Sequence, residues 1–345
     1  MPWMENISLE EYNTFGINAV ARYFARFSDQ EQLAVLLDSI PGSSPSVQRS
    51  PSRPVFILGG GSNILLTGNI DGLVLRNEIT GIDLVFEDEK YLYVRVGAGE
   101  NWHRFVQYCL DRDWAGVENL SLIPGSVGAA PMQNIGAYGV ELKEVFHELE
   151  ALDLEDGRVR MFTLNDCHFG YRESIFKKEY KGRFIILNVT FRLNRVPVFH
   201  TQYGAIREEL DKMGVKQLSI RAISQAVIQI RSAKLPDPAK IGNAGRFFKN
   251  PTIPNDRFVA LQAQFPGIVG YPAQDVTKLA AGWLIEQCGW KGYRRGDAGC
   301  HARQALVLVN YGHATGREIY DLSEEILRSV RQKFGVTLER EVNIL

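Results

Sequence analysis

The sequence has few of the residues that hold metals or form disulfides. Its only cysteines are Cys109, Cys167, Cys288 and Cys300, and no two of them have the C-x-x-C spacing of a zinc or redox motif. The histidines are scattered as well. Dispersed thiols of this kind suit reduced cysteines in the cytoplasm better than disulfides or a structural zinc ion. We therefore expect a cytoplasmic protein without a metal site.

Long apolar runs and an imbalance of charge are also missing. No run reaches the ~18 apolar residues of a membrane-spanning helix. The N-terminal MPWMENISLEEYN has acidic side chains where a signal peptide has a basic and then an apolar region. The net charge of -1 gives no electrostatic reason to expect nucleic acid or an acidic membrane surface as a partner. A few placed cations would then have to bind any anionic substrate.

The composition is otherwise that of an ordinary globular protein, with 45% hydrophobic and 23% charged residues. The chain exceeds one typical core, so we expect two or three domains. Strands near Val55 and Tyr91 followed by separated helices predict an α+β fold. Pro236 and Pro238 follow a predicted helix over residues 219–231 and mark the best boundary between domains.

Hydrophobic periodicity and turn residues predict further elements. A capping box at Ser28–Glu31 begins a short helix. A helix over 100–112 places Trp102, Phe105, Cys109 and Leu110 on one side, which we interpret as core. The remaining elements are strands at 55–58, 91–98 and 184–193, a hairpin over 149–162, helices over 277–287 and 317–334, and a Ser/Pro-rich surface connection over 41–54.

Residues 119–139, NLSLIPGSVGAAPMQNIGAYG, contain no Asp, Glu, Lys, Arg or His. Glycine and proline break the segment too often for a helix interior. Small side chains let a ligand approach the backbone, and glycine allows the positive φ that turns successive N–H groups to one side. Such a segment can hold an anion or a flat cofactor with main-chain donors. A buried loop between two closely packed elements would have the same composition.

A second glycine cluster follows the apolar run Val55–Leu58 and reads GGGSN, Gly59 to Asn63. A G-x-G-x-x-G that opens a helix is absent, because residues 64–75 alternate and contain turn signals. A Gly-Lys-Ser/Thr phosphate loop is absent too. The cluster therefore belongs neither to a Rossmann unit nor to an NTPase.

Together the two clusters resemble an FAD-binding domain of the vanillyl-alcohol-oxidase type, in which two loops hold the pyrophosphate with backbone N–H groups. The segments GGGSN, GAGENWHRFV, ENLSLIPGSVGAAPMQNIGAYGVEL, FGYRESIFK, KLPDP and QALVLVN occur in this order and resemble the UDP-N-acetylenolpyruvoylglucosamine reductase family. The motifs run from Asn13 to Glu341. The resemblance implies an FAD-binding region over 1–235, with subdomains of about 1–80 and 81–235. It also implies a C-terminal α+β substrate domain over 236–345 whose last strand returns toward the flavin.

The implied activity is NADPH-dependent reduction of UDP-N-acetylglucosamine enolpyruvate to UDP-N-acetylmuramate through non-covalent FAD, a step of peptidoglycan precursor synthesis. A monomer that binds a UDP-sugar is expected. The implied FAD contacts are Gly59, Gly60, Gly61, Ser62, Asn63, Pro124, Gly125, Ser126, Gly128, Ala129, Asn134, Gly136, Ala137 and Arg231.

The resemblance also implies the substrate-binding and catalytic residues. Tyr171 and Arg172 of FGYR match the pair that binds the substrate carboxylate, and an arginine fits a carboxylate with two parallel hydrogen bonds. Glu341 matches the catalytic glutamate. Tyr203 matches the tyrosine that closes over the substrate diphosphate in the class with a longer loop. Further substrate contacts are implied at Lys234, Asn250 and Gln304.

One position departs from the family pattern. Arg246, within GNAGRFFKN, stands where the family has the serine or cysteine that donates a proton. A guanidinium is a very poor acid and is much larger than a hydroxyl. Water or a neighbour could deliver the proton, the side chain could swing out, or the reaction could be impaired. A flavin-dependent sugar oxidase, or a flavin and UDP-sugar binding protein without catalysis, remain alternative functions.

Overall fold

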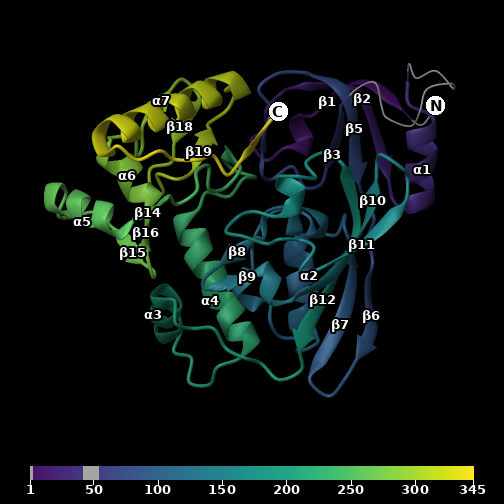
Figure 1. The fold of residues 1–345 in the computed structure, drawn as a ribbon, viewed down its shortest axis with the longest axis horizontal. Coiled ribbons are helices and arrows are strands. Elements are labelled where there is room, and N and C mark those ends of the chain that lie inside the picture. The colour runs from purple at the N-terminus through teal and green to yellow at the C-terminus, as the bar shows by residue number, and fades with distance from the viewer. Residues whose placement is uncertain (1–2, 42–53) are drawn as a thin grey trace. The chain divides into compact units, whose positions relative to one another are not determined.

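The computed structural model describes residues 3–41 and 54–345, and the chain forms two compact units (Figure 1). The first unit consists of Met1–Ile7, Ala21–Gly60 and Ile70–Ala233. The second consists of Ser8–Val20, Gly61–Asn69 and Lys234–Leu345. The surface connection predicted over 41–54 lies almost wholly outside the described residues.

The first unit begins with a four-stranded sheet in the order β1-β2-β5-β3, in which β2 and β3 both pair parallel with β5. Its elements are β1 (Met4–Ser8), β2 (Val20–Phe27), α1 (Gln30–Asp38), β3 (Val55–Leu58) and β5 (Ile70–Asn77). Leu33 and Leu36 of α1 are buried together with Leu73 and Leu75 of β5 in one hydrophobic cluster. The predicted strand at 55–58 is confirmed, and it leads directly into the glycine cluster.

A second, antiparallel sheet of the first unit has the order β11-β10-β12-β7-β6. Its strands are β6 (Ile82–Glu87), β7 (Tyr91–Gly97), β10 (Phe146–Asp153), β11 (Val159–Thr163) and β12 (Phe184–Asn194). The predicted strands at 91–98 and 184–193 and the predicted hairpin over 149–162 are thereby confirmed.

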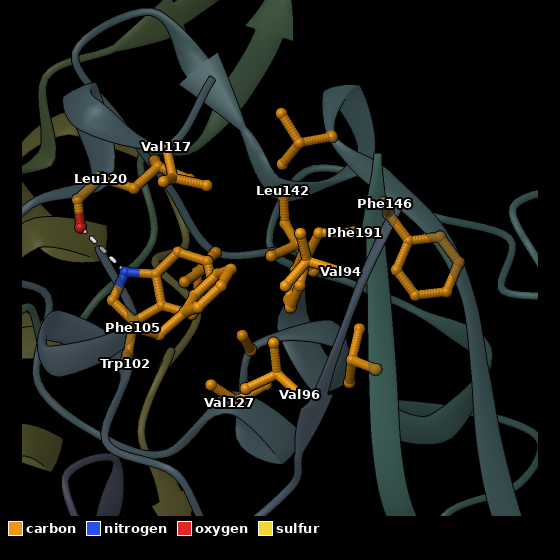
Figure 2. Close-up of a cluster of buried hydrophobic side chains, with 14 of the residues drawn as sticks. Val94, Val96, Trp102, Phe105, Val117, Leu120, Val127, Leu142, Phe146 and Phe191 are labelled. Carbon is orange, nitrogen blue, oxygen red and sulfur yellow. Dashed lines mark hydrogen bonds between the residues drawn. The ribbon is translucent and has the colours of Figure 1, made fainter. Parts of the chain in front are cut away.

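The core of the first unit is an aromatic cluster between helix α2 (Trp102–Asp111) and this sheet (Figure 2). Phe105 lies parallel to Phe191 of β12 with ring centroids 4.8 Å apart, and Trp102 meets Phe191 edge-on. The interpretation of the α2 stripe as core is confirmed, since all four of its residues are buried. The Trp102 indole donates a hydrogen bond of 2.9 Å to the carbonyl of Leu120, which ties the charge-free segment to the core.

Between α2 and β10 the chain runs through short elements, namely the 3₁₀ turns η2 (Glu118–Leu120), η3 (Val127–Ala129), η4 (Pro131–Gln133) and η5 (Leu142–Glu144) and the strands β8 (Gly136–Ala137) and β9 (Val140–Glu141). The turn η6 (Ile175–Lys177) precedes β12, and α3 (Gly204–Lys212) and α4 (Ile220–Lys234) follow it. Ile206 and Leu210 of α3 pack with Ile223 and Val227 of α4. The helix predicted over 219–231 is confirmed and continues to Lys234.

The second unit contains small sheets and three helices among its described residues. Its elements are η1 (Glu10–Tyr12), β4 (Ile64–Leu65), β13 (Gly242–Asn243), β14 (Thr252–Pro254), α5 (Asn255–Gln264), β15 (Gly270–Pro272), β16 (Val276–Leu279), α6 (Ala281–Gln287), β17 (Arg294–Arg295), β18 (Ala298–Cys300), β19 (Leu308–Asn310), α7 (Gly316–Phe334) and β20 (Asn343–Ile344). The α7 helix lies on β18 and β19 of the sheet β13-β19-β18-β17 (Figure 1).

Hydrogen bonds explain why two short N-terminal segments belong to the second unit. The last strand, β20, pairs parallel with β4, and Thr67 N donates to Leu345 O over 2.7 Å. Asn310 Nδ2 donates to Phe15 O over 2.9 Å. The sequence analysis describes continuous domain ranges, whereas the compact units are discontinuous.

Two predicted elements need correction. The α1 helix is capped by Asp29, not Ser28, because the Asp29 carboxylate accepts from Gln32 N over 2.8 Å. The helix predicted over 277–287 was too long, since Val276–Leu279 forms the central strand of β14-β16-β15 and the helix begins at Ala281. The helix predicted over 317–334 is confirmed as α7, which Thr315 and Glu318 cap reciprocally.

Candidate functional site

The two glycine-rich segments meet in the first unit at Gly59–Gly60 and Gly125–Ser126. A Cβ atom added to Gly60 would lie 2.9 Å from Gly125 Cα, and one added to Gly59 would lie 2.2 Å from Ser126 Oγ. Neither Gly59 nor Gly60 has a positive φ. Glycine is therefore required at position 60 by the close approach of two backbones, and at position 59 it makes room for the side chain of Ser126.

Main-chain N–H groups remain available where the two segments meet. Among the described residues, the N–H groups of Gly60, Gly125 and Ser126 donate no hydrogen bond. The surrounding backbone is fixed, because Trp102 N donates to Gly125 O over 3.0 Å and Val127 N donates to Glu100 O over 2.8 Å. Rigid, unused N–H groups free of side-chain bulk suit an anionic group such as a pyrophosphate.

Arg172 is held on the segment that contains Asn134 and Gly136. Its guanidinium donates to Asn134 O over 3.3 Å and to Gly136 O, and its side chain is mostly buried. A Cβ on Gly136 would lie 2.8 Å from Arg172 Nη1, so the small residue makes room for the guanidinium. Arg172 itself has φ 56°, a left-handed conformation that non-glycine residues adopt rarely. The predicted carboxylate-binding residue is thus fixed on the predicted cofactor segment.

The side chain of Asn134, a residue for which the resemblance implies an FAD contact, makes several hydrogen bonds within the protein. Its amide Nδ2 donates to Gly170 O over 3.0 Å and to Glu141 Oε2 over 3.2 Å. Its Oδ1 accepts from Lys143 N over 3.1 Å. The side chain therefore fastens the loop before Arg172 to the β8–β9 turn.

Two tyrosines from different loops are in contact, Tyr138 between β8 and β9 and Tyr203 directly before α3. The rings of Tyr138 and Tyr203 meet edge-on, with centroids 5.5 Å apart. Tyr203 is 49% exposed and directly precedes α3. The predicted diphosphate tyrosine is thus accessible and packs beside the segment of Gly136 and Ala137.

Arg231 lies on α4 near His103. Burial lowers the pKa of His103, and the positive charge of Arg231 lowers it further. Leu122 N donates to the His103 Nδ1 over 3.0 Å, so this nitrogen is an acceptor and carries no proton. Arg231 thus brings a positive charge close to His103, which binds the charge-free segment at Leu122.

In the second unit, Arg246 and Glu341 lie on neighbouring antiparallel segments. Glu341 N donates to Phe247 O over 2.9 Å, and Phe248 forms a bridge with Arg340. Glu341 is mostly buried, and Asn63 Nδ2 donates to its carbonyl oxygen over 3.4 Å. Arg246, in contrast, is exposed, and its guanidinium makes no hydrogen bond or ion pair with the described residues.

Asn250 and Gln304 are brought together around the first turn of α6. Asn250 Oδ1 accepts from Ala281 N over 3.1 Å. A Cβ on Gly282 would lie 3.3 Å from Gln304 Oε1. Lys234 is exposed at the end of α4. The two predicted polar contacts of the second unit therefore form one cluster, and Lys234 lies apart from it in the sequence and on another element.

Two buried polar residues are not predicted from the sequence: Glu118 directly precedes the segment 119–139, and Asn119 is its first residue. Glu118 is buried, and its carboxylate accepts from Gly116 N over 2.6 Å. Asn119 is buried as well, and its amide joins two separate loops. An acidic residue next to an otherwise charge-free stretch was the available signal.

In the described ranges no helix is long and apolar enough to cross a membrane.

The unused N–H groups, the close glycine backbones and the fixed arginine define a flavoprotein with an FAD-binding domain, and residues 47–163 match the family model described as FAD binding domain. Residues 237–345 match the model of the C-terminal domain of UDP-N-acetylenolpyruvoylglucosamine reductase. The chain belongs to the UDP-N-acetylenolpyruvoylglucosamine reductase family.

Curated relatives and a solved structure agree with this assignment. The reductase of Pseudomonas putida is 51% identical over 343 residues, which cover 99% of this chain and 98% of the relative. The reductase of Amoebophilus asiaticus is 51% identical, and the alignment covers 100% of both chains. The crystal structure of the reductase from Thermus caldophilus superposes with a TM-score of 0.65 at 25% identity and covers 99% of this chain and 98% of that one.

We predict that Gly60→Ala abolishes retention of FAD. The new methyl group would lie 2.9 Å from Gly125 Cα, a contact that neither rigid backbone can relieve without moving the N–H groups. Gly68→Ala is the matched control, because a Cβ there meets nothing within 4 Å and its φ is not positive. Flavin absorbance per protein after gel filtration measures the effect. Equal flavin content in both variants would contradict the role of this approach.

We also predict a pH-dependent effect at Glu118. Burial raises the pKa of its carboxyl above the ordinary value, against the opposing effects of backbone N–H groups, with that of Gly116 first, and of His200. The folded state therefore binds the proton more tightly than the unfolded state, so the free energy of unfolding falls as pH rises from the ordinary value to the native one. Glu118→Gln should gain thermal stability relative to the wild type as pH rises through this window. A stability difference that stays constant or shrinks with pH would refute the assignment.

Proposed function

We propose that this chain reduces UDP-N-acetylglucosamine enolpyruvate to UDP-N-acetylmuramate with NADPH as the electron donor. The observation that carries the proposal is the guanidinium of Arg172, anchored on the carbonyls of Asn134 and Gly136 within the FAD-binding domain. FAD, when bound, supplies the hydride chemistry that no side chain of the protein can perform. The remaining work is binding, polarisation and proton delivery.

Arg172 binds and polarises the substrate carboxylate. Hydride addition to the enolpyruvyl double bond puts negative charge on this carboxylate as an enolate, so a fixed cation stabilises the transition state more than the ground state. A guanidinium stays protonated at any working pH and can meet both carboxylate oxygens. Its anchorage to two main-chain carbonyls means that little reorganisation is needed during the reaction. Tyr171, whose ring lies 5.2 Å from the guanidinium carbon, supports the pair.

Glu341 shares a hydrogen bond with the enolate, directly or through water. A carboxylate beside an enolate needs a proton or a bridging water, because two negative charges would otherwise repel each other. The position of Glu341 is suited to this role, because the residue is mostly buried and its main chain is held by the hydrogen bond to Phe247 O.

Arg246 leaves the usual proton-donor position without a hydroxyl. Its exposed guanidinium has no partner in the described chain, which favours the alternative in which the side chain points to solvent and water delivers the proton. An impaired binding protein remains the second candidate function. Measured turnover of the enolpyruvyl sugar separates the two.

The residues assigned to the UDP-sugar are each assigned by their match to the family pattern. Tyr203 serves the diphosphate, and Lys234, Asn250 and Gln304 serve the same ligand. We further propose that the protein works in the cytoplasm as a monomer and contributes to cell-wall synthesis. Size-exclusion chromatography with light scattering tests the oligomeric state.

We predict that the FAD is bound without a covalent bond. GGGSN and its neighbours contain no histidine or cysteine that could form a covalent link to the flavin. Acid precipitation of the yellow protein should therefore release all flavin into the supernatant, where chromatography identifies it as FAD. Colour that stays in the protein pellet would contradict the prediction.

A further inference from the structure

Asn119 joins two loops of the first unit through a single nitrogen atom. Its Nδ2 donates to Tyr138 O over 3.0 Å and to His200 O over 2.8 Å. The two acceptors lie 19 and 81 positions away in the sequence. Tyr138 lies between β8 and β9, and His200 lies between β12 and α3. The residue is 1% exposed, so no water replaces these bonds easily.

Among uncharged side-chain groups, only a primary amide offers two donors on one atom. Its orientation is settled, because a flipped amide would point an oxygen at two carbonyl oxygens. The Oδ1 atom is buried and has no partner among the described residues. An unmet acceptor disfavours folding, so the bridge between the two loops is the contribution of this side chain to the structure.

Turn η2, which carries Asn119, is held in place by hydrogen bonds to two helices. Ser121 Oγ lies 2.7 Å from Ser224 Oγ of α4 and donates to or accepts from it, and the Leu120 carbonyl accepts the Trp102 indole hydrogen bond. Turn η2 is therefore held by both α2 and α4. A side chain on this turn can fix a loop in place without moving itself.

The joined loops carry the residues that the proposed function needs. Gly136 and Ala137 immediately precede Tyr138, and Tyr203 follows His200 by three positions. The Tyr138 and Tyr203 rings are in edge-on contact. Before His200, Val196 and Val198 are 76% and 58% exposed, so the preceding part of the loop has little packing of its own. Closer to Tyr203, Phe199 packs against two hydrophobic clusters and Asn119 binds the carbonyl of His200, so these contacts attach the loop there.

We infer that Asn119 is a positioning residue that fixes the base of the loop bearing Tyr203, at His200, to the segment of Gly136 to Tyr138, so that Tyr203 closes over the substrate diphosphate from a defined position. This inference rests on the proposed function for the role of Tyr203. A loop that samples many conformations binds in proportion to its competent fraction, so releasing it weakens substrate binding. The rate of flavin reduction by NADPH is the comparison, and we expect it to stay unchanged.

The first test needs no substrate. Hydrogen–deuterium exchange is compared for the FAD-loaded wild type, Asn119→Asp, which keeps the shape but has no N–H group, and Asn119→Ser. The peptide covering 196–206 should exchange faster in both variants, while the α2 peptide over 102–111 should not change. Unchanged exchange over 196–206 overturns the inference. Loss of FAD from both variants also overturns it, since Asn119 would then support the flavin segment itself.

The second test asks whether Asn119 acts through Tyr203. Asn119→Asp should raise the KM for the UDP-sugar about 10-fold and leave the rate of flavin reduction by NADPH unchanged. In a Tyr203→Ala background the same change should alter KM by no more than about twofold, because the partner is already lost. Additive effects in the two backgrounds overturn the inference. If the wild type does not turn over the sugar at all, the proposed function fails while the exchange experiment still decides the loop contact.

Discussion

Arg246→Ser should accelerate the transfer of hydride equivalents from the reduced flavin to the enolpyruvyl sugar. A serine hydroxyl restores a donor of suitable size, and a positioned general acid contributes roughly 10²–10⁴ in rate. The substitution also removes a cation that could compete with Arg172 for the substrate carboxylate. We therefore expect reoxidation of the reduced flavin by the substrate to be at least about 10²-fold faster.

Arg246→Ala is the matched control, because it removes the same cation without adding a hydroxyl. If the wild type lacks a proton donor, flavin reoxidation should be much faster in Arg246→Ser than in Arg246→Ala. If the cation is what interferes, Ser and Ala should be equally fast. A cation near the flavin can stabilise its anionic reduced form, so reduction by NADPH is measured separately by rapid mixing.

The fold limits how far the substitution disturbs the protein. Arg246 is exposed, and the segment is held by buried Phe247 and Phe248, whose backbone bonds to Leu306 and to the strand of Glu341 do not involve the guanidinium. The free energy of unfolding of the variant should stay within about 0.5 kcal/mol of that of the wild type. Flavin reoxidation that is unchanged or slower in Arg246→Ser would contradict the explanation that a proton donor is missing. Arg246 would then contribute to catalysis itself.

Arg172→Ala should separate the two half-reactions. Negative charge develops on the substrate carboxylate only during transfer to the sugar, so the loss of the cation should slow that step by about 10²–10³. Reduction of the flavin by NADPH should stay within about twofold, since no charge of this kind develops in it. Alanine and arginine meet the same backbone cost at φ 56°, so the variant introduces no new strain there.

Arg172→Lys refines the result. It keeps the charge but loses the planar pair of donors, so transfer should fall between the wild type and Arg172→Ala. Rapid mixing under anaerobic conditions measures both steps, and flavin content controls for the lost bonds to Asn134 and Gly136. Equal slowing of both half-reactions would show that Arg172 supports the structure or binds NADPH.

Local sequence patterns were sufficient to predict several strands and helices of the first unit. The apolar residues of strand β3 and of helix α2 indicate these elements, and the spacing in α2 is enough to predict which of its residues are buried. The glycine-rich segments were recognisable because close backbone contact restricts composition strongly. Gly60 against Gly125 shows the reason in atomic terms.

Long-range contacts could not be read from the same patterns. The pairing of β20 with β4 joins residues 343 and 64, and nothing near either residue encodes it. Glu341 was identified by family resemblance alone, because a glutamate near a chain end is ordinarily a solvated charge. The strand Val276–Leu279 was mistaken for helix because a short apolar run fits both periods, and its partners β14 and β15 decide the outcome.

Asn119 illustrates a third limit. In the sequence it is one small polar residue in a segment that contains many, and its two bonds connect loops far apart along the chain. Side-chain-to-backbone bridges of this kind leave no periodic signal. The role of Asn134 was obscured in the same way, since its side chain serves the loop of Arg172.

The most direct test of the account follows the oxidised-flavin absorbance band of the FAD-loaded protein without oxygen. NADPH should bleach the band, and subsequent addition of UDP-N-acetylglucosamine enolpyruvate should restore it with formation of UDP-N-acetylmuramate. The account would be contradicted by a band that stays bleached with the enolpyruvyl sugar and returns only when oxygen is admitted.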